Sequence, residues 1–396
     1  MTTRPLSGFR ILDVTNVLSG PFCGYQLGLL GAEIIKVEAL DGDLARQLGA
    51  NPDWNQQHMG VSYLAQNAGK RSIALDLKTD AGQQIFCELV KTSDAVVENF
   101  RPGVMQRLGL DYAKLIQLKD PLIYCAITGF GQQGPMASQP AYDQIVQGLS
   151  GVMGVTGSSD SGPLRVGYPM ADTIGGLTAA MAVAAALHRK ESQYIDVSML
   201  ESVLTTMGWV ASNWLMAGQT PARLGNDNMT AAPSGAFQTQ DGLINIAANQ
   251  DRQWLALASV CGLDVLTEDP RFADRESRKQ HRQELTAALE VVLKQHTTAH
   301  WVNQLTAAGV PAGAVLGVHE ALNLEQVKGR HFVTTVEQGQ PATDIRMVTN
   351  GFLLNSERLT PGHSVEALGA STDALLQELG YDPETIASLQ KQGVIR

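Results

Sequence analysis

The sequence predicts an α/β fold in which a large, doubly wound domain is joined to a smaller α+β domain. Short apolar runs alternate with longer, helix-like segments in the first part of the chain. The 39 glycines and the hydrophobic share of 44% suit buried elements joined by tight turns. The length of 396 residues exceeds what one hydrophobic core usually holds, so we expect two domains.

A strand, a helix and a second strand open the chain. Residues 9–14 form a short apolar run bounded by Gly8 and Thr15, which is typical of a buried strand. Pro21 begins a periodic segment that ends at Gly31, as a helix with a glycine stop does. Residues 33–38 form the next strand. This βαβ unit implies parallel strands and a right-handed crossover.

The pattern continues with strands at residues 72–77, 95–99 and 122–128 and helices at residues 81–90 and 113–117. This arrangement predicts a Rossmann-like large domain. The first strand is followed by Ser-Gly-Pro-Phe-Cys-Gly over residues 19–24, so the GxGxxG fingerprint of dinucleotide-binding enzymes is absent there. The sequence has no P-loop either, which argues against a nucleotide-hydrolysing or nicotinamide enzyme.

The central feature of the chain is an acid at the start of an apolar helix. Residues 176–187 are nearly all small and apolar, which suits a helix packed closely on several sides. Asp172 precedes them in the first turn, where unpaired backbone amides favour an ionised and oriented carboxylate. Such a group can be a nucleophile, although most aspartates at this position only cap a helix.

The rest of the chain divides into a small domain and a tail. A strand at residues 195–199 and a helix at residues 200–216 complete the large domain, which we assign to residues 1–216 and 330–396. Residues 217–329 form the predicted small domain, with a hairpin at residues 236–247 and helices at 254–260, 283–295 and 297–308. Ser371 and Asp382 each begin a tail helix that we expect to pack on the large domain.

Composition excludes several classes of function. A net charge of -10 argues against nucleic acid as a partner. Four widely spaced cysteines indicate neither disulfides nor a zinc site, and His296 and His300 lack the glutamate of a zinc-protease motif, so no metal is expected. The start of the chain lacks a signal peptide, and the apolar run before His188 is too short to cross a bilayer. We therefore expect a cytoplasmic protein without a membrane partner.

Eight short motifs occur in the order found in class III CoA-transferases, the family that includes carnitine, bile-acid and formyl-CoA transferases. The chain resembles this family over essentially its whole length. The matching segments are residues 12–15 with Gly20-Pro21, 30–38, 70–78, 98–103, 129–135, the Asp172 helix, 309–313 and 376–381.

The resemblance implies that Asp172 is the nucleophile. Its carboxylate would attack an acyl-CoA to form a mixed anhydride, which returning CoA would convert into an aspartyl-CoA thioester. Coenzyme A thioesters are then substrates, and no cofactor is bound permanently. We expect acetyl-CoA or succinyl-CoA as the donor and a small dicarboxylic or hydroxy acid as the acceptor. The resemblance also implies a homodimer with interlocked chains.

The same resemblance assigns residues to the binding of CoA and of the acyl group. Those expected to contact CoA are Asn16, Val17, Leu18, Ser19, Arg71, Ala74, Leu75, Lys78, Asn99, Phe100, Arg101, Arg107 and Tyr142. Tyr142 and Asp143 would shape the acyl pocket or serve as core and cap residues, and the backbone at Ser234 and Gly235 would stabilise oxyanions or form a simple turn. Arg46, Arg165 and residues 226–229 are candidates for the acceptor's second carboxylate.

Two other functions compete with CoA transfer. The α-methylacyl-CoA racemases share the fold and abstract a proton with a His-Asp pair, but Tyr142 stands where that histidine would be. A CoA-binding protein without catalysis would be indicated by loss of the acid at position 172, which is present. Thr128 and Pro140 replace two lysines of formyl-CoA transferase, which argues against formyl-CoA and oxalate as the substrate pair.

Overall fold

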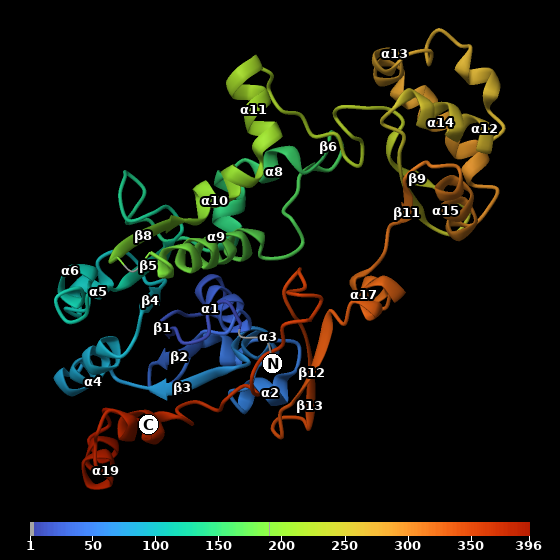
Figure 1. The fold of residues 1–396 in the computed structure, drawn as a ribbon. Helices are drawn as coiled ribbons and strands as arrows, with labels where there is room; N and C mark the ends of the chain where they lie inside the picture. Colours follow the sequence, from blue (N-terminus) through green and yellow to red (C-terminus); the bar gives the residue numbers. More distant parts are fainter. Residues whose placement is uncertain (1–3, 190) are drawn as a thin grey trace. The chain divides into compact units, whose positions relative to one another are not determined.

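The computed structural model describes residues 4–189 and 191–396 (Figure 1). Contacts divide the chain into two compact units. The first unit comprises the chain up to Val152 together with Arg165–Gly218 and Glu325–Arg396, and the second comprises Met153–Leu164 and Gln219–Leu324. The sequence had placed residues 153–164 in the large domain. They belong to the second unit because they form a small hairpin whose Gly157 carbonyl accepts a hydrogen bond from the Gly225 amide (2.8 Å).

A six-stranded parallel sheet forms the centre of the first unit, as the sequence predicts. Its strand order is β3-β2-β1-β4-β5-β8, the order of a doubly wound fold. The strands are β1 (Arg10–Asp13), β2 (Glu33–Glu38), β3 (Lys70–Ala74), β4 (Ala95–Glu98), β5 (Ile123–Thr128) and β8 (Gln193–Ser198). Their side chains are mostly buried, because helices cover both faces of such a sheet.

Helices α1 (Ser19–Leu29) and α9 (Met170–Leu187) pack against each other on one face of the sheet. Glycines allow this close approach: a Cβ atom added at Gly176 would lie 2.4 Å from the Ser19 carbonyl oxygen. Helix α9 begins at Met170, so that Asp172 lies in its first turn, as predicted. It is the one helix of the described chain long and apolar enough to cross a membrane, but half of it is buried, as in a core helix.

The other face carries α4 (Asp80–Lys91) and the two tail helices, α18 (Thr372–Glu378) and α19 (Pro383–Lys391). The tail contributes Leu376 and Ile395 to the same core as the sheet residues, which confirms that it packs on the first unit. Asp382 caps α19 as predicted. Ser371 does not cap α18, because its hydroxyl donates to the Glu366 carboxylate instead.

The helix predicted over residues 200–216 is two helices, α10 (Met199–Thr206) and α11 (Gly208–Ala217), which meet at Met207. The remaining elements of the first unit are short. They are α2 (Pro52–Gln56), α3 (Val61–Asn67), α5 (Val104–Arg107), α6 (Tyr112–Leu115), α7 (Asp143–Leu149), α8 (Val152–Val155, at the boundary), α17 (Glu325–Gly329), β12 (Val333–Glu337), β13 (Asp344–Val348) and a 3-10 turn at Leu44–Gln47.

The second unit has an antiparallel sheet in the order β11-β10-β9, and its helices share one core with that sheet. The predicted hairpin is β9 (Ser234–Gln238) and β10 (Leu243–Ala247), followed much later by β11 (Ala312–Ala314). Thr297 caps α15, as the sequence predicts. The other elements are β6 (Gly157–Ser158), β7 (Gly162–Pro163), α12 (Asp251–Val260), α13 (Arg275–Gln280), α14 (Arg282–Leu293), α15 (Thr298–Ala307), α16 (Val318–Ala321) and a 3-10 turn at Asp264–Thr267.

Candidate active site

A cavity of about 190 Å³ lies at the carboxyl ends of β1, β4 and β5, where doubly wound proteins bind their ligands. The residues around it come from the loop after β1, the loop after β4, the end of β5, the segment before α7 and the starts of α9 and α10. They are Asn16, Val17, Leu18, Ser19, Asn99, Arg101, Ile127, Thr128, Gly129, Ala141, Tyr142, Asp172 and Met199. The structure thus brings Asp172 together with seven of the residues that the resemblance assigns to CoA.

The carboxyl group of Asp172 lies in the first turn of α9, as predicted, but its charge is not stabilised as we expected. Burial raises its pKa to about 7, and the nearby Asp143 adds to this effect. The expectation of a firmly ionised carboxylate is therefore wrong. The physical reasons are burial and the charge of Asp143; no hydrogen bond from the described residues to Asp172 offsets them, and the Ala171 amide at the helix start donates to Asp143 Oδ1 instead (2.7 Å).

Asp143 fixes the segment that leads into α9. Besides the Ala171 amide, its carboxylate accepts a hydrogen bond from Gln147 Nε2 (2.8 Å). Gln147 Nε2 also donates to the Tyr168 carbonyl (3.1 Å), and Gln147 Oε1 accepts from the Val166 amide (2.9 Å). Asp143 is itself buried and is not among the residues that line the Asp172 cavity, so it positions the start of α9 next to Asp172.

The loop after β1 forms another wall of the cavity and is held in a strained conformation. Val17 has a φ of 68°, which is unfavourable for a β-branched residue. Its amide donates to Asp43 Oδ1 (2.9 Å). Asn16 is clamped on both sides by Asn99, whose Oδ1 accepts from the Asn16 amide and whose Nδ2 donates to the Asn16 carbonyl, each at 2.8 Å. Strain of this kind occurs where the surrounding structure fixes a functional loop.

Buried charges lie beneath this loop. Lys36 Nζ is 3.1 Å from Asp43 Oδ2 and donates to the Thr15 carbonyl. Lys70 Nζ is 2.8 Å from Asp13 Oδ2 and also donates to the Pro21 carbonyl (2.8 Å). Burial opposes these charges, but the paired lysines hold the pKa of the Asp13 carboxyl below its usual value. These lysine–aspartate ion pairs hold the loop after β1 on its buried side, and the other side of the loop lines the cavity.

A second cavity, of about 420 Å³, adjoins the first through Asn16, which lines both. It holds three more of the residues expected to contact CoA, namely Leu75, Lys78 and Phe100. Lys78 is exposed and supplies a cation, while Leu75 and Phe100 belong to apolar walls. Three acids, Glu38, Asp41 and Asp76, also line this cavity, and Lys78 is the one cation among its described lining residues.

Several predicted residues lie away from these two cavities. The guanidinium of Arg71 pairs with Glu33 (2.9 Å) and Glu378 (2.7 Å). Ala74 is fully buried, and its carbonyl accepts from the Arg396 amide of the tail (3.3 Å). Arg107 lies on α5 and lines neither cavity.

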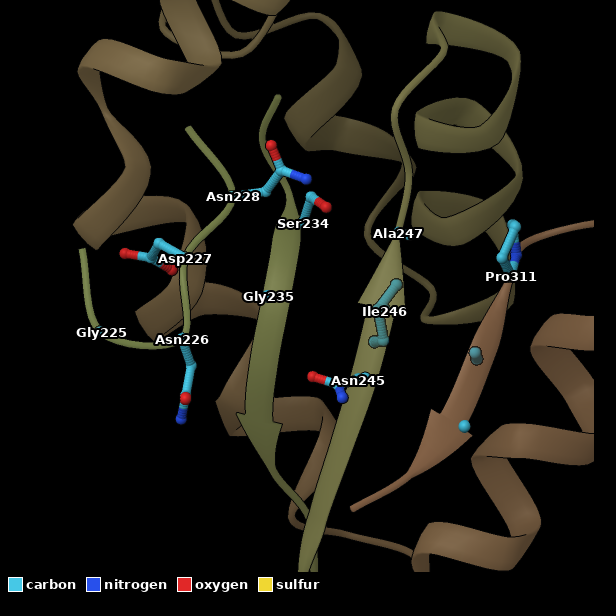
Figure 2. Close-up of a pocket in the computed structure, with 12 residues that line it drawn as sticks. Gly225, Asn226, Asp227, Asn228, Ser234, Gly235, Asn245, Ile246, Ala247 and Pro311 are labelled. Atoms are coloured by element: carbon cyan, nitrogen blue, oxygen red, sulfur yellow. The ribbon is translucent and has the colours of Figure 1, made fainter. Parts of the chain in front are cut away.

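The candidates for binding the acceptor also have other surroundings. Arg46 is fully buried and holds Glu38 through two hydrogen bonds of 2.7 Å, so it cannot meet a substrate. Arg165 is exposed and lines neither of these cavities. Ser234, Gly235 and residues 226–228 line a cavity of about 560 Å³ within the second unit (Figure 2).

The sequence did not identify Thr128 and Met199 as part of the Asp172 cavity, nor Asp43 as a support of the loop. Thr128 could have been identified from the sequence, because it is the last residue of a predicted parallel strand and ligands bind at the carboxyl ends of such strands. The role of Asp43 depends on contacts with Val17 and Lys36 that no local pattern reveals. Among residues 4–189 and 191–396, no group of His, Cys, Asp or Glu side chains is arranged to hold a metal ion.

Comparisons with known proteins agree with this picture. The model of CoA-transferase family III matches residues 6–372. Acetyl-CoA:oxalate CoA-transferase from Acetobacter aceti is 41% identical over 335 residues, which are 83% of this chain and 85% of that protein. Succinyl-CoA:glutarate CoA-transferase from Mus musculus is 34% identical over 399 residues, covering 99% of this chain and 90% of that protein.

The crystal structure of a CAIB/BAIF family protein from Brucella suis has a TM-score of 0.83 and 31% identity, with 96% of this chain and 100% of that chain covered. The fold and the comparisons together define an enzyme class, the transferases that move coenzyme A between acids. The chain belongs to CoA-transferase family III.

Proposed function

We propose that this enzyme transfers CoA from a donor thioester to a small dicarboxylic acid through a covalent intermediate on Asp172. The observation that carries the proposal is the place of Asp172 in the cavity at the carboxyl ends of the parallel strands, beside the strained loop after β1. Thioesters and anhydrides are both activated acyl groups, so exchange between carboxylates is sufficient for the transfer.

The proposed reaction has four steps. The ionised Asp172 carboxylate attacks the thioester carbonyl carbon, a C–O bond forms, the C–S bond breaks and CoA leaves as a thiolate. The thiolate then attacks the Asp172 carbonyl carbon and releases the donor acid. The acceptor carboxylate attacks the resulting aspartyl thioester and displaces CoA again. In the last step the thiolate attacks the acceptor's acyl carbon, which forms the new thioester and restores the Asp172 carboxylate.

One cation in each of the two cavities supports the assignment of the charged groups of the substrates. Arg101 is the one cation among the residues that line the Asp172 cavity, and it makes no ion pair within the described chain. We assign it to the acceptor's second carboxylate. Lys78 and Phe100, in the adjoining cavity, are assigned to the nucleotide of CoA. Relatives of this chain are named for oxalate, glutarate, mesaconate and D-citramalate, which are all small dicarboxylic acids. For the donor we propose acetyl-CoA or succinyl-CoA.

The cysteines support the cytoplasmic location that the sequence predicts. Cys23, Cys87, Cys125 and Cys261 are free thiols, and three of them are buried. Reduced thiols are the rule in a cytoplasm.

The test is mass spectrometry of the enzyme after brief incubation with a panel of acyl-CoAs, followed by hydroxylamine. We expect a hydroxamate at Asp172 with the true donor, and its complete loss in Asp172→Ala. Asp160→Ala, which removes an exposed aspartate of the second unit, is the matched control and should load as the wild type does. Absence of any adduct, together with exchange of the substrate's α-proton in deuterium oxide, would replace the transferase proposal with a racemase.

A further inference from the structure

A third cavity of the first unit, of about 310 Å³, lies apart from the two that we assign to the substrates. One wall is a face of the parallel sheet, at β4, β5 and the edge strand β8. The other wall is formed by α5, α6 and the residues between them, and Met105 and Leu115 of these helices share a core with the sheet. Of the residues that line this cavity, only Arg101 also lines the Asp172 cavity. The volume is sufficient for a small molecule.

Strand register divides the cavity into an aromatic part and a polar part. Tyr124 of β5 pairs with Tyr194 of β8. Glu98 of β4 pairs with Ala126, two residues after Tyr124. Residues two apart in a strand point to the same face of a sheet, so the Glu98 carboxyl and both tyrosine rings lie on one face. Glu98 is nearer to the carboxyl ends of the strands, and the tyrosines lie further back.

Three tyrosine rings form the aromatic part. The rings of Tyr124 and Tyr194 are stacked, with centroids 5.7 Å apart. The ring of Tyr112, from α6, lies 5.4 Å from that of Tyr194 and 6.0 Å from that of Tyr124. Tyr194 is 44% exposed, so the cavity opens to solvent at the edge of the sheet. An apolar side chain of a ligand can enter there and pack on the rings.

The polar part contains a buried acid without a cation. Glu98 is only 5% exposed, and its Oε2 accepts a hydrogen bond from the Phe100 amide (2.7 Å). No cation of the described chain pairs with it, and burial, with a further contribution from Asp196, raises its pKa to about 7. Asp111, the second acid of the cavity, caps α6 by accepting from the Lys114 amide (3.1 Å). An ammonium group of a ligand would supply the partner that Glu98 lacks.

Two hydrogen-bond donors face the same part of the cavity. Gln132 Nε2 is buried and has no hydrogen-bond partner within residues 4–189 and 191–396. The Gln132 amide donates to Asp196 (2.9 Å), which pairs with Ala126 and so lies in the same row of the sheet as Glu98. Arg101 lines the cavity too, with no ion pair to a described residue. A buried donor without a partner and a guanidinium suit a carboxylate.

We propose that this cavity binds an α-amino acid with an apolar side chain. The ammonium group pairs with Glu98, the carboxylate accepts from Gln132 and Arg101, and the side chain packs on the three tyrosines. This site goes beyond CoA transfer, which needs none of these groups except Arg101. An occupant competes for Arg101, so the amino acid inhibits the enzyme by competing with the acceptor acid; this kinetic consequence rests on the proposed function.

The first test measures binding to the whole enzyme by calorimetry. The probes are L-phenylalanine and L-leucine, with 3-phenylpropionate, which lacks the ammonium group, and phenethylamine, which lacks the carboxylate. We expect both amino acids to bind, and L-phenylalanine to bind about tenfold or more tightly than either analogue, because each analogue loses hydrogen bonds between charged groups.

Two variants locate the site. Glu98→Gln keeps an oxygen for the Phe100 amide and should weaken L-phenylalanine about tenfold, through loss of a charged partner. Gln132→Ala removes an amide whose Nε2 has no partner to lose, and should weaken it about fivefold, the effect of one neutral hydrogen bond. Gln133→Ala, the exposed neighbour outside the cavity, is the matched control and should bind as the wild type does.

Several outcomes would overturn the proposal. They are no binding of either amino acid, equally tight binding of an analogue, and unchanged affinity in both Glu98→Gln and Gln132→Ala. In steady-state assays L-phenylalanine should raise the KM for the acceptor acid and leave kcat unchanged, and an unchanged KM would refute the competition for Arg101. Failure of the transferase proposal looks different, because the wild type would then form no hydroxamate while calorimetry would still detect the amino acid.

Discussion

At the scale of single residues, the carboxyl of Asp172 must be ionised to act as a nucleophile, yet burial and Asp143 raise its pKa to about 7. A raised pKa means that the inactive, protonated form persists up to neutral pH. The rate of acyl transfer to Asp172 should therefore fall as the pH drops through about 7 and reach a plateau above it.

Asp143→Asn tests this dependence, because it removes one of the two causes of the raised pKa and keeps an oxygen to accept from the Ala171 amide. We expect the pH midpoint of single-turnover CoA release to shift to lower pH, with a smaller change in the plateau rate. The control is Asp160→Asn, which removes an exposed charge of the second unit and should leave the midpoint unchanged. An unchanged midpoint in Asp143→Asn would show that Asp143 does not influence the ionisation of Asp172.

The residue scale also shows where sequence reasoning ends. The local pattern placed Asp172 in the first turn of an apolar helix, and only the resemblance of the whole chain to a family pointed to it as the nucleophile. Its raised pKa could not be predicted, since it depends on Asp143, which lies 29 positions away, and on which of the two acids takes the Ala171 amide. Arg71 and Arg46 were proposed as ligand-binding residues because they are arginines. In the structure they form ion pairs with Glu378 and Glu38, which only the tertiary structure brings next to them.

At the scale of elements, the contact between α1 and α9 joins two walls of the active-site cavity. Gly176→Ala would put a methyl group 2.4 Å from the Ser19 carbonyl oxygen and 3.2 Å from the Phe22 ring. Overpacking of this kind costs about 1–3 kcal/mol. We expect a matching loss of stability in urea unfolding, and slower loading of Asp172, because Ser19 and Asp172 line the same cavity.

Gly208→Ala is the matched control, since nothing lies within 4 Å of the added methyl group at the start of α11. It should keep wild-type loading, with stability unchanged or slightly raised by the better helix propensity of alanine. A Gly176→Ala enzyme with wild-type stability and loading would show that the two helices can separate without affecting the site.

The sequence predicted the strands well, because their residues are buried on both faces. It predicted the ends of helices less well, because tertiary contacts determine where a helix begins or breaks. The strands of the parallel sheet were recognisable because both of their faces are apolar. The start of α9 was predicted to within its first turn, but no cap marks Met170 as its first residue, because Pro169 offers no side-chain cap and the first amides are engaged by Asp143 and by local carbonyls. The break between α10 and α11 at Met207 was not predicted, because no proline stands there to indicate the end of a helix.

At the scale of the whole molecule, α11 presents an apolar surface that the rest of the first unit does not cover. None of its residues is buried, and Trp209, Leu215 and Met216 are 80%, 79% and 85% exposed. Exposed apolar groups of this kind usually mark an interface. Together with the resemblance to a family of interlocked dimers, this surface leads us to propose a second copy of the chain as its partner.

Interlocking makes a prediction that an ordinary dimer does not. Two linked chains cannot separate unless one of them opens, so subunits should not exchange in native buffer. We expect no mixed dimers, by native mass spectrometry, after long incubation of tagged with untagged enzyme, and mixed dimers only after unfolding in denaturant and refolding.

Leu215→Glu should lower the denaturant concentration at which exchange begins, because it places a charge in the surface that the second copy would cover. Val265→Glu, at an exposed residue of the second unit, should not. Exchange in native buffer would indicate a dimer without interlocking, and a monomer at all concentrations would leave the surface of α11 without a second copy.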